Sequence, residues 1–137
     1  MTTSGFEVVD HTADWALRIY GRDLPDLLIQ AALGMGSLLV ADLDSVPLTV
    51  RRTVSLQAMD RESLLVGWLS ELAYWAEEER LIFRQFELCD VSETRLQGTA
   101  YGGQAAELQK HIKAVTYHNL DIQQTETGLV TTIVFDV

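Results

Sequence analysis

The chain has 137 residues, 47% of them apolar, and carries a formal net charge of −10 from twenty acidic and ten basic residues. Its length predicts a single domain over residues 1–137, and its charge argues against strong direct nucleic-acid binding, which needs a basic stripe. There is no apolar run of roughly 18 residues that could cross a membrane, so no membrane association is expected. The sequence has no signal-peptide pattern, and its one cysteine cannot form an internal disulfide. These two features predict a cytoplasmic location.

The N-terminal part predicts two strands followed by a helix. The first strand covers residues 6–9, and alternating apolar residues predict a second, half-buried strand over 15–20. Asp23 is the expected N-cap of the helix. Gly34 and Gly36 lie inside this helix and predict close packing against a sheet.

The middle of the chain alternates strand and helix in the same way. A period of two over 48–58 predicts a strand with Leu48 on its inner face. Arg52 interrupts that face, which predicts a position at a sheet edge. Asp60 is the expected N-cap of a second helix over 61–80, with a broad apolar stripe.

The C-terminal part is predicted to be mostly strand, around one irregular and mobile loop over 102–110. The order of all these elements predicts an α+β fold, in which two helices pack on a largely antiparallel β-sheet. The remaining predicted strands cover 81–90, 95–101, 112–118, 121–124 and 129–136.

A lysine in the predicted strand 112–118 draws attention to a candidate site. Lys113 stands among apolar residues, where a charge needs a counter-charge or access to water. Asp14 and Asp136, near opposite ends of the chain, are candidate counter-charges. The carboxylate expected at Val137 would repel Asp136, and a hard cation such as Ca²⁺ or Mg²⁺ with Asp14 as third ligand would relieve this. Lys113 would do so too, and a solvated strand end is the remaining alternative.

Other residue types give little support for catalysis by the chain itself. His11 and His118 are candidates for acid–base groups or ligands, and also for structural histidines held by hydrogen bonds. A Gly-x-Ser-x-Gly motif is absent from the sequence. Cys89 stands in a strand-like run and is expected to be buried and unreactive.

Four segments in this order resemble the archease family along nearly the whole chain. The string from Lys113 to His118, Lys-Ala-Val-Thr-Tyr-His, is the most specific of them. The others are His-Thr-Ala-Asp at 11–14, Glu-Ser-Leu-Leu-Val-Gly-Trp-Leu-Ser-Glu-Leu at 62–72 and Val-Phe-Asp-Val at 134–137.

The resemblance implies a protein activator of an RtcB-type RNA ligase, which acts in tRNA splicing and RNA repair. An archease is expected to promote guanylylation of the ligase and multiple turnover, and to broaden its nucleotide use. The resemblance also implies a divalent-cation site, for calcium with Mg²⁺ or Mn²⁺ as alternatives. Its ligands would be Asp14, Asp136 and the main-chain oxygens of Val137, with His11 and His118 as candidate residues around them. Asp14, Lys113 and Asp136 would serve activation of the partner.

Two other functions stay open from the residues, and two segments depart from the family pattern. A small metal-dependent hydrolase or nucleotide-processing enzyme would use Asp14, Asp136 and a metal. A chaperone-like modulator of another RNA-modifying enzyme would suit the acidic surface. Trp15 stands where a small or β-branched residue is common in the family. The loop 102–110 lacks a His-containing segment, which puts partner docking through it in question.

Overall fold

The computed structural model describes residues 4–9 and 15–137. Two α-helices, one short 3₁₀ helix and eight strands lie in these residues, and the predicted α+β class is confirmed. In chain order the elements are β1 (Gly5–Val9), β2 (Trp15–Gly21), α1 (Leu24–Leu39), η1 (Leu43–Ser45), β3 (Val50–Gln57), α2 (Arg61–Glu79), β4 (Leu81–Val91), β5 (Arg95–Gln104), β6 (Ala114–Thr116), β7 (Gln123–Thr125) and β8 (Gly128–Asp136).

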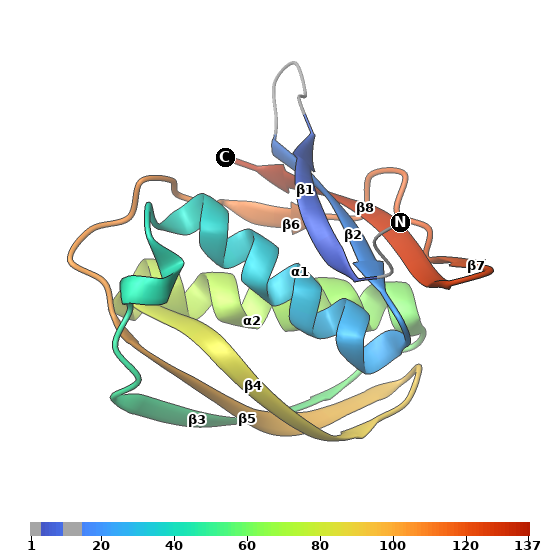
Figure 1. Ribbon diagram of the computed structural model, residues 1–137, viewed down its shortest axis with the longest axis horizontal. Helices are drawn as coiled ribbons and strands as arrows, with labels where there is room; N and C mark the ends of the chain where they lie inside the picture. The colour runs from blue at the N-terminus through green and yellow to red at the C-terminus, as the bar shows by residue number, and fades with distance from the viewer. Residues whose placement is uncertain (1–3, 10–14) are drawn as a thin grey trace.

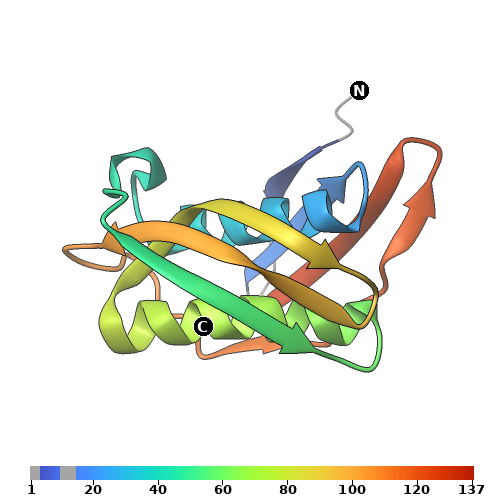
Figure 2. The same ribbon diagram turned by 90° about the horizontal axis from the view of Figure 1, so that it is seen from below.

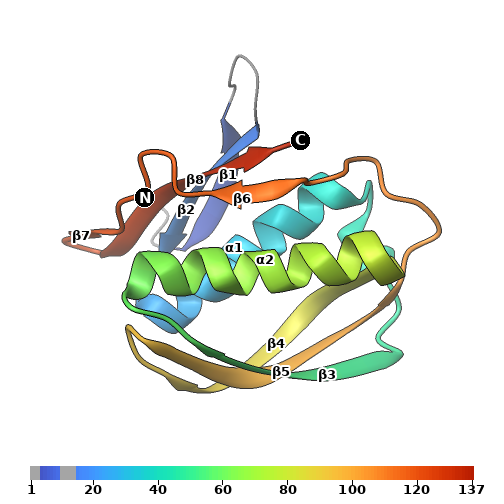
Figure 3. The ribbon, with the colours of Figure 1, turned by 180° about the vertical axis from the view of Figure 1, so that it is seen from behind.

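The strands form two separate antiparallel sheets, where the sequence analysis expected one. The first sheet has the order β1-β2-β8-β6, with β7 also paired to β8, and the second has the order β3-β5-β4. Both helices lie between the two sheets (Figures 1 and 3). The strands of the three-stranded sheet run obliquely across one side of α2, as Figure 2 shows. Alternation in a sequence shows which face of a strand is buried but not which strand it pairs with, so the division into two sheets was not visible in the sequence.

The core fills the space between the helices and both sheets as one connected cluster. Trp68 of α2 is fully buried in it, and its indole N–H donates to the main-chain oxygen of Leu28 on α1 at 2.8 Å. The ring of Trp68 also meets Phe86 of β4 edge to face, with 5.5 Å between the centroids. One side chain therefore joins the two helices and the three-stranded sheet.

Both predicted N-caps are confirmed. Asp23 accepts a hydrogen bond from the Asp26 N–H at 2.9 Å, and Asp60 accepts one from the Ser63 N–H at 2.8 Å. These carboxylates satisfy amides that the first turn of a helix leaves unpaired. The sequence located the helix starts correctly because a cap is a local interaction.

The Asp60 cap predicts an acid-dependent contribution to stability. The hydrogen bond from the Ser63 backbone N–H lowers the pKa of Asp60 from its ordinary value of 3.8. A lowered folded-state pKa stabilises the fold above the unfolded-state value, and this contribution is lost as the pH falls through the folded-state pKa. We expect Asp60→Ala to lower Tm at neutral pH, and the difference from wild type to shrink as the pH falls below the ordinary value. Calorimetry across pH measures this, and a constant Tm difference would contradict it. Asp60→Asn, which also caps, serves as the control.

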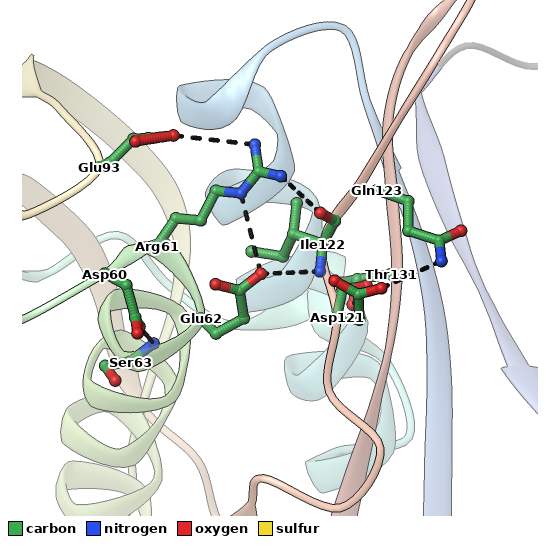
Figure 4. A network of polar contacts seen from close by, with 9 residues as sticks. All are labelled: Asp60, Arg61, Glu62, Ser63, Glu93, Asp121, Ile122, Gln123 and Thr131. Atoms are coloured by element: carbon green, nitrogen blue, oxygen red, sulfur yellow. Dashed lines mark hydrogen bonds and ion pairs between the residues drawn. The ribbon is translucent and has the colours of Figure 1, made fainter.

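The first turn of α2 is also tied to the segment between β6 and β7 (Figure 4). The Arg61 guanidinium donates to the main-chain oxygen of Ile122 at 2.6 Å, and the Ile122 N–H donates to Glu62 Oε2 at 2.9 Å. The Thr131 hydroxyl of β8 donates to the main-chain oxygen of Asp121 at 3.0 Å. The network therefore fixes this segment between α2 and the five-stranded sheet.

The glycines of α1 pack closely, but only one packs against a sheet. A Cβ at Gly34 would lie 3.0 Å from the side chains of both Leu17 and Phe6, on β2 and β1, as predicted. A Cβ at Gly36 would instead meet Leu43 of η1 at 3.1 Å. The close packing is confirmed for both, while the partner of Gly36 was wrong.

The strand predicted over 48–58 is shorter at both ends. Leu48 precedes β3 and is 46% exposed, so its predicted place on an inner face was wrong. Arg52 does lie on an edge strand, since β3 is an outer strand of its sheet. Its guanidinium binds Glu79 through two contacts of 2.7 Å and covers the ring of Trp75, which explains a charge on an otherwise inner face.

Two strand boundaries in the C-terminal part also differ. Gly102 and Gly103 belong to β5, not to the loop predicted over 102–110. The strand needs glycine at both positions, because a Cβ would collide with a neighbouring main-chain oxygen. The strand predicted over 112–118 shrinks to the three residues of β6.

No helix among the described residues is both long enough and apolar enough to cross a bilayer.

Candidate functional site at the end of the five-stranded sheet

Strand pairing brings the segments with the candidate residues to one end of the five-stranded sheet. β8 lies between β2 and β6, so that Phe135 pairs with Trp15 on one side and with Val115 on the other. Ala114 pairs with Asp136. Trp15, the lysine segment and the end of β8 therefore lie on neighbouring strands. The predicted meeting of Asp14 with them falls outside the described residues.

Lys113 and Asp136 are in direct contact through their main chains. The Lys113 N–H donates to the main-chain oxygen of Asp136 at 2.8 Å. Both side chains are exposed, and no ion pair within the described part of the chain includes either of them. The prediction of Lys113 within a strand was wrong, because β6 begins at Ala114 and the ammonium group reaches water instead of an apolar face.

Three of the predicted site residues need separate comment. His11 and Asp14 lie outside the described residues. His118 follows β6 in a turn, not in a strand as predicted. Its N–H donates to Thr116 Oγ1 at 3.3 Å, and its ring Nε2 lies 3.3 Å from Nδ2 of Asn119.

The end of β8 supplies part of an oxygen-ligand set for a hard cation. The Asp136 carboxylate is exposed, and main-chain oxygens of Val137 follow it directly. Carboxylate and main-chain oxygens are the ligands that Ca²⁺ prefers. Within residues 4–9 and 15–137 there is no group of three or more His, Cys, Asp or Glu side chains that would hold a metal. The end of β8 therefore offers oxygen atoms of the type that the implied calcium site needs, from two of its three implied ligands.

A cavity of about 450 Å³ opens beside Lys113, between α2 and the segment 111–115. His111 lies at its wall, and the imidazole Nδ1 is 2.9 Å from Glu77 Oε2 on α2. No role for His111 was predicted from the sequence, since a pairing across 34 residues leaves no trace in local spacing. Other lining residues are Ser70, Ala73, Tyr74, Glu78 and Val115.

The two departures from the family pattern meet each other in the structure. Trp15 is half-buried, and the Lys110 ammonium stands 4.0 Å from the centroid of its ring. Residues 105–110 are irregular, as predicted, and the irregular segment continues to Lys113, where a strand was predicted. Hydrogen bonds tie this segment 105–113 to both helices. It is therefore more restrained than a mobile loop.

Cys89, in contrast, is exposed, so the prediction of a buried thiol was wrong. The register of β4 against β5 shifts between Leu88 and Asp90, and this irregularity leaves Cys89 without a paired residue. A bulge of one residue changes which side chains face the core. Cys89 Sγ contacts only the Gln97 main-chain oxygen, at 3.5 Å, among the contacts described for it.

Comparison with known proteins places these features in a family context. The model of the Archease protein family (MTH1598/TM1083) matches residues 6–137. The protein archease of Methanosarcina barkeri is 33% identical over 140 residues, covering 96% of this chain and 95% of the relative. That of Saccharolobus islandicus is 37% identical over 137 residues, covering 96% and 98%.

Solved structures agree with the fold. Protein 1598 of Methanobacterium thermoautotrophicum superposes with a TM-score of 0.80 at 31% identity, covering 97% of this chain and 99% of that one. An archease of Thermotoga maritima, described as a possible chaperone, gives a TM-score of 0.63 at 21% identity, covering 96% of each chain. The second likeness concerns the fold alone.

Proposed function

This chain belongs to the archease family, and on that premise we propose that it is a cytoplasmic protein activator of an RtcB-type RNA ligase. In this role it promotes guanylylation of the ligase and multiple turnover in tRNA splicing and RNA repair, and it broadens the nucleotides that the ligase accepts. It performs no turnover of its own.

One observation carries the proposal: Lys113 and Asp136 lie side by side and exposed at one end of the five-stranded sheet. The string that begins at Lys113 is the segment that resembles the family most specifically, and Asp136 lies in another of the four segments. Both side chains are exposed and so are available to a partner's active site, and the main-chain hydrogen bond fixes the backbone that carries them. Binding therefore requires little further ordering of the main chain.

The charge of the chain supports a protein partner over direct RNA binding. A net charge of −10 favours encounter with a basic surface and repels phosphates. An RNA ligase that binds RNA presents such a basic surface. The activator would therefore act on the enzyme and leave the RNA to it.

A divalent cation, with calcium the first choice, would be held by Asp14, Asp136 and the main-chain oxygens of Val137. When bound, it would neutralise the carboxylates and fix the end of β8. Lys113 supplies a positive charge for an anionic group of the partner or its nucleotide. Docking of this end at the ligase active site would adjust the geometry of the ligase histidine or metal, so that attack on GTP becomes productive.

A turnover assay tests the proposal. The RtcB-type ligase from the same source is mixed with limiting activator, GTP, Mn²⁺ and excess RNA ends, and product per ligase is counted. We expect a change from single to multiple turnover. An active ligase that gains nothing from the activator would contradict the proposal and favour another partner enzyme.

Lys113→Met is expected to lower the stimulated rate by at least about tenfold, because a contact between charged groups contributes about 1.5–3 kcal/mol. The Lys113 N–H, and with it the main-chain contact to Asp136, is retained in the variant. Asp14→Ala is expected to give a similar loss. Gln123→Ala, on β7, is the control and keeps full stimulation. Full stimulation by Lys113→Met would exclude the lysine from the activating contact.

A further inference from the structure

The segment 105–113 joins β5 to β6 and leads directly into the candidate site. Its start is fixed at the end of α2, where the Ala105 N–H donates to the Arg80 main-chain oxygen at 2.9 Å. The Arg80 guanidinium donates back to the Ala106 main-chain oxygen at 2.8 Å. The segment runs along one end of the molecule, past the C-terminal end of α1 (Figure 1).

Gln109 binds the C-terminal end of α1. Its N–H donates to the main-chain oxygen of Leu39 at 2.8 Å. Its side-chain amide lies 3.2 Å from the main-chain oxygen of Leu38 and 3.4 Å from that of Ser37. The last carbonyls of a helix have no partner within the helix, and α1 has no basic residue in its last turn. Gln109 therefore takes over the capping of α1 from outside the helix.

Lys110 binds a different element, β2. Its ammonium group stands 4.0 Å from the centroid of the Trp15 ring, which is the geometry of a cation–π contact. Trp15 pairs with Phe135, the residue before Asp136. The contact therefore ties the segment to the strand that flanks the end of β8.

His111 binds a third element, α2, through Glu77 at 2.9 Å. The next residue, Ile112, is buried in the core at 7% exposure. Three consecutive side chains thus reach α1, β2 and α2 in turn. Two residues after His111, the Lys113 N–H meets the main-chain oxygen of Asp136.

We infer that Gln109, Lys110 and His111 are positioning residues, which together hold Lys113 beside Asp136 in the conformation that acts on the partner. None of the three touches Asp136 in the described contacts, so they act through the main chain. Each contact is exposed or half-exposed and weak by itself, while three contacts to three elements restrict an irregular segment strongly. The part of this inference that concerns activation rests on the proposed function.

Amide exchange of Lys113 tests, without any ligase, whether these three residues hold Lys113 beside Asp136. In the triple variant Gln109→Ala, Lys110→Met, His111→Ala, we expect the Lys113 N–H to exchange at least about tenfold faster by NMR, because its hydrogen bond opens more often. The amides of α2 around Trp68 report that the core is still folded. Lys110→Arg alone preserves the cation–π contact and is expected to exchange like wild type. Unchanged exchange of Lys113 in the folded triple variant would overturn the inference.

Ligase stimulation tests the functional part. Since the triple variant retains Lys113 and Asp136, we expect the activator concentration for half-maximal stimulation to rise about tenfold. The maximum at saturation is expected to stay near wild type, whereas Lys113→Met is defective at saturation. Faster exchange with an unchanged half-maximal concentration would overturn the positioning role. A ligase that wild-type protein does not stimulate would overturn the proposed function alone. The exchange result would still decide whether the three residues hold Lys113 in place.

Discussion

Replacing Asp136 by alanine is expected to abolish most of the stimulation of the ligase, by at least about tenfold, without unfolding the protein. The side chain is exposed at the end of β8, and the contact of this residue with Lys113 uses its main-chain oxygen, which alanine retains. The loss would therefore come from the missing carboxylate and not from the strand. Product per ligase at saturating activator measures it.

Two controls separate charge, position and metal. Asp136→Asn keeps the shape and removes the charge, so it is expected to fail like alanine. Asp121→Ala removes an exposed carboxylate from the segment between β6 and β7, away from the end of β8, and is expected to stimulate normally. Calcium titration calorimetry on the same variants shows whether binding and stimulation disappear together. Full stimulation by Asp136→Ala would refute the assignment of the site to this end of the sheet.

Trp68→Ala is expected to lower the free energy of unfolding by about 3–5 kcal/mol, the usual cost of truncating a large buried aromatic residue. Its ring is fully buried against Phe86, and its indole N–H is the partner of the Leu28 main-chain oxygen. Truncation leaves a cavity between helix and sheet and removes the hydrogen bond that joins α2 to α1. Urea unfolding monitored by circular dichroism measures the change.

A residue on the same helix gives the matched control for Trp68. Tyr74 is 60% exposed, and Tyr74→Ala is expected to change the unfolding free energy by no more than about 0.5 kcal/mol. Trp68→Phe keeps most of the ring volume and loses the hydrogen bond, so it is expected to fall between the two. Equal effects of Trp68→Ala and Tyr74→Ala would contradict the placement of Trp68 at the junction of the layers.

The sequence predicted features that depend on neighbouring residues and missed those that depend on distant ones. The caps at Asp23 and Asp60 were correct because their hydrogen bonds span three residues. The predicted end of β5 was wrong because glycine is typical of loops, and the sequence does not show that the main chain of β4 packs against Gly102. The prediction that Cys89 is buried was wrong because the alternation of apolar residues does not reveal a shift in strand register.

The same distinction holds for the candidate site. The chemistry of a lone lysine and the resemblance singled out Lys113 and Asp136, and the pairing of β6 with β8 brings them together. Gln109 was missed, because its partners at the end of α1 lie about seventy residues away. No spacing in the sequence connects a glutamine in a loop with the carbonyls of an earlier helix.

The place of β8 between β2 and β6 has a consequence for synthesis of the protein. A ribosome makes β2 early and β8 after all the other described strands, so β2 lacks one of its two neighbours until residues 128–136 emerge. During that time one of its edges is open to chaperones and to other chains. Closure of the five-stranded sheet, and with it the meeting of Lys113 and Asp136, therefore comes late in the order in which the strands are made.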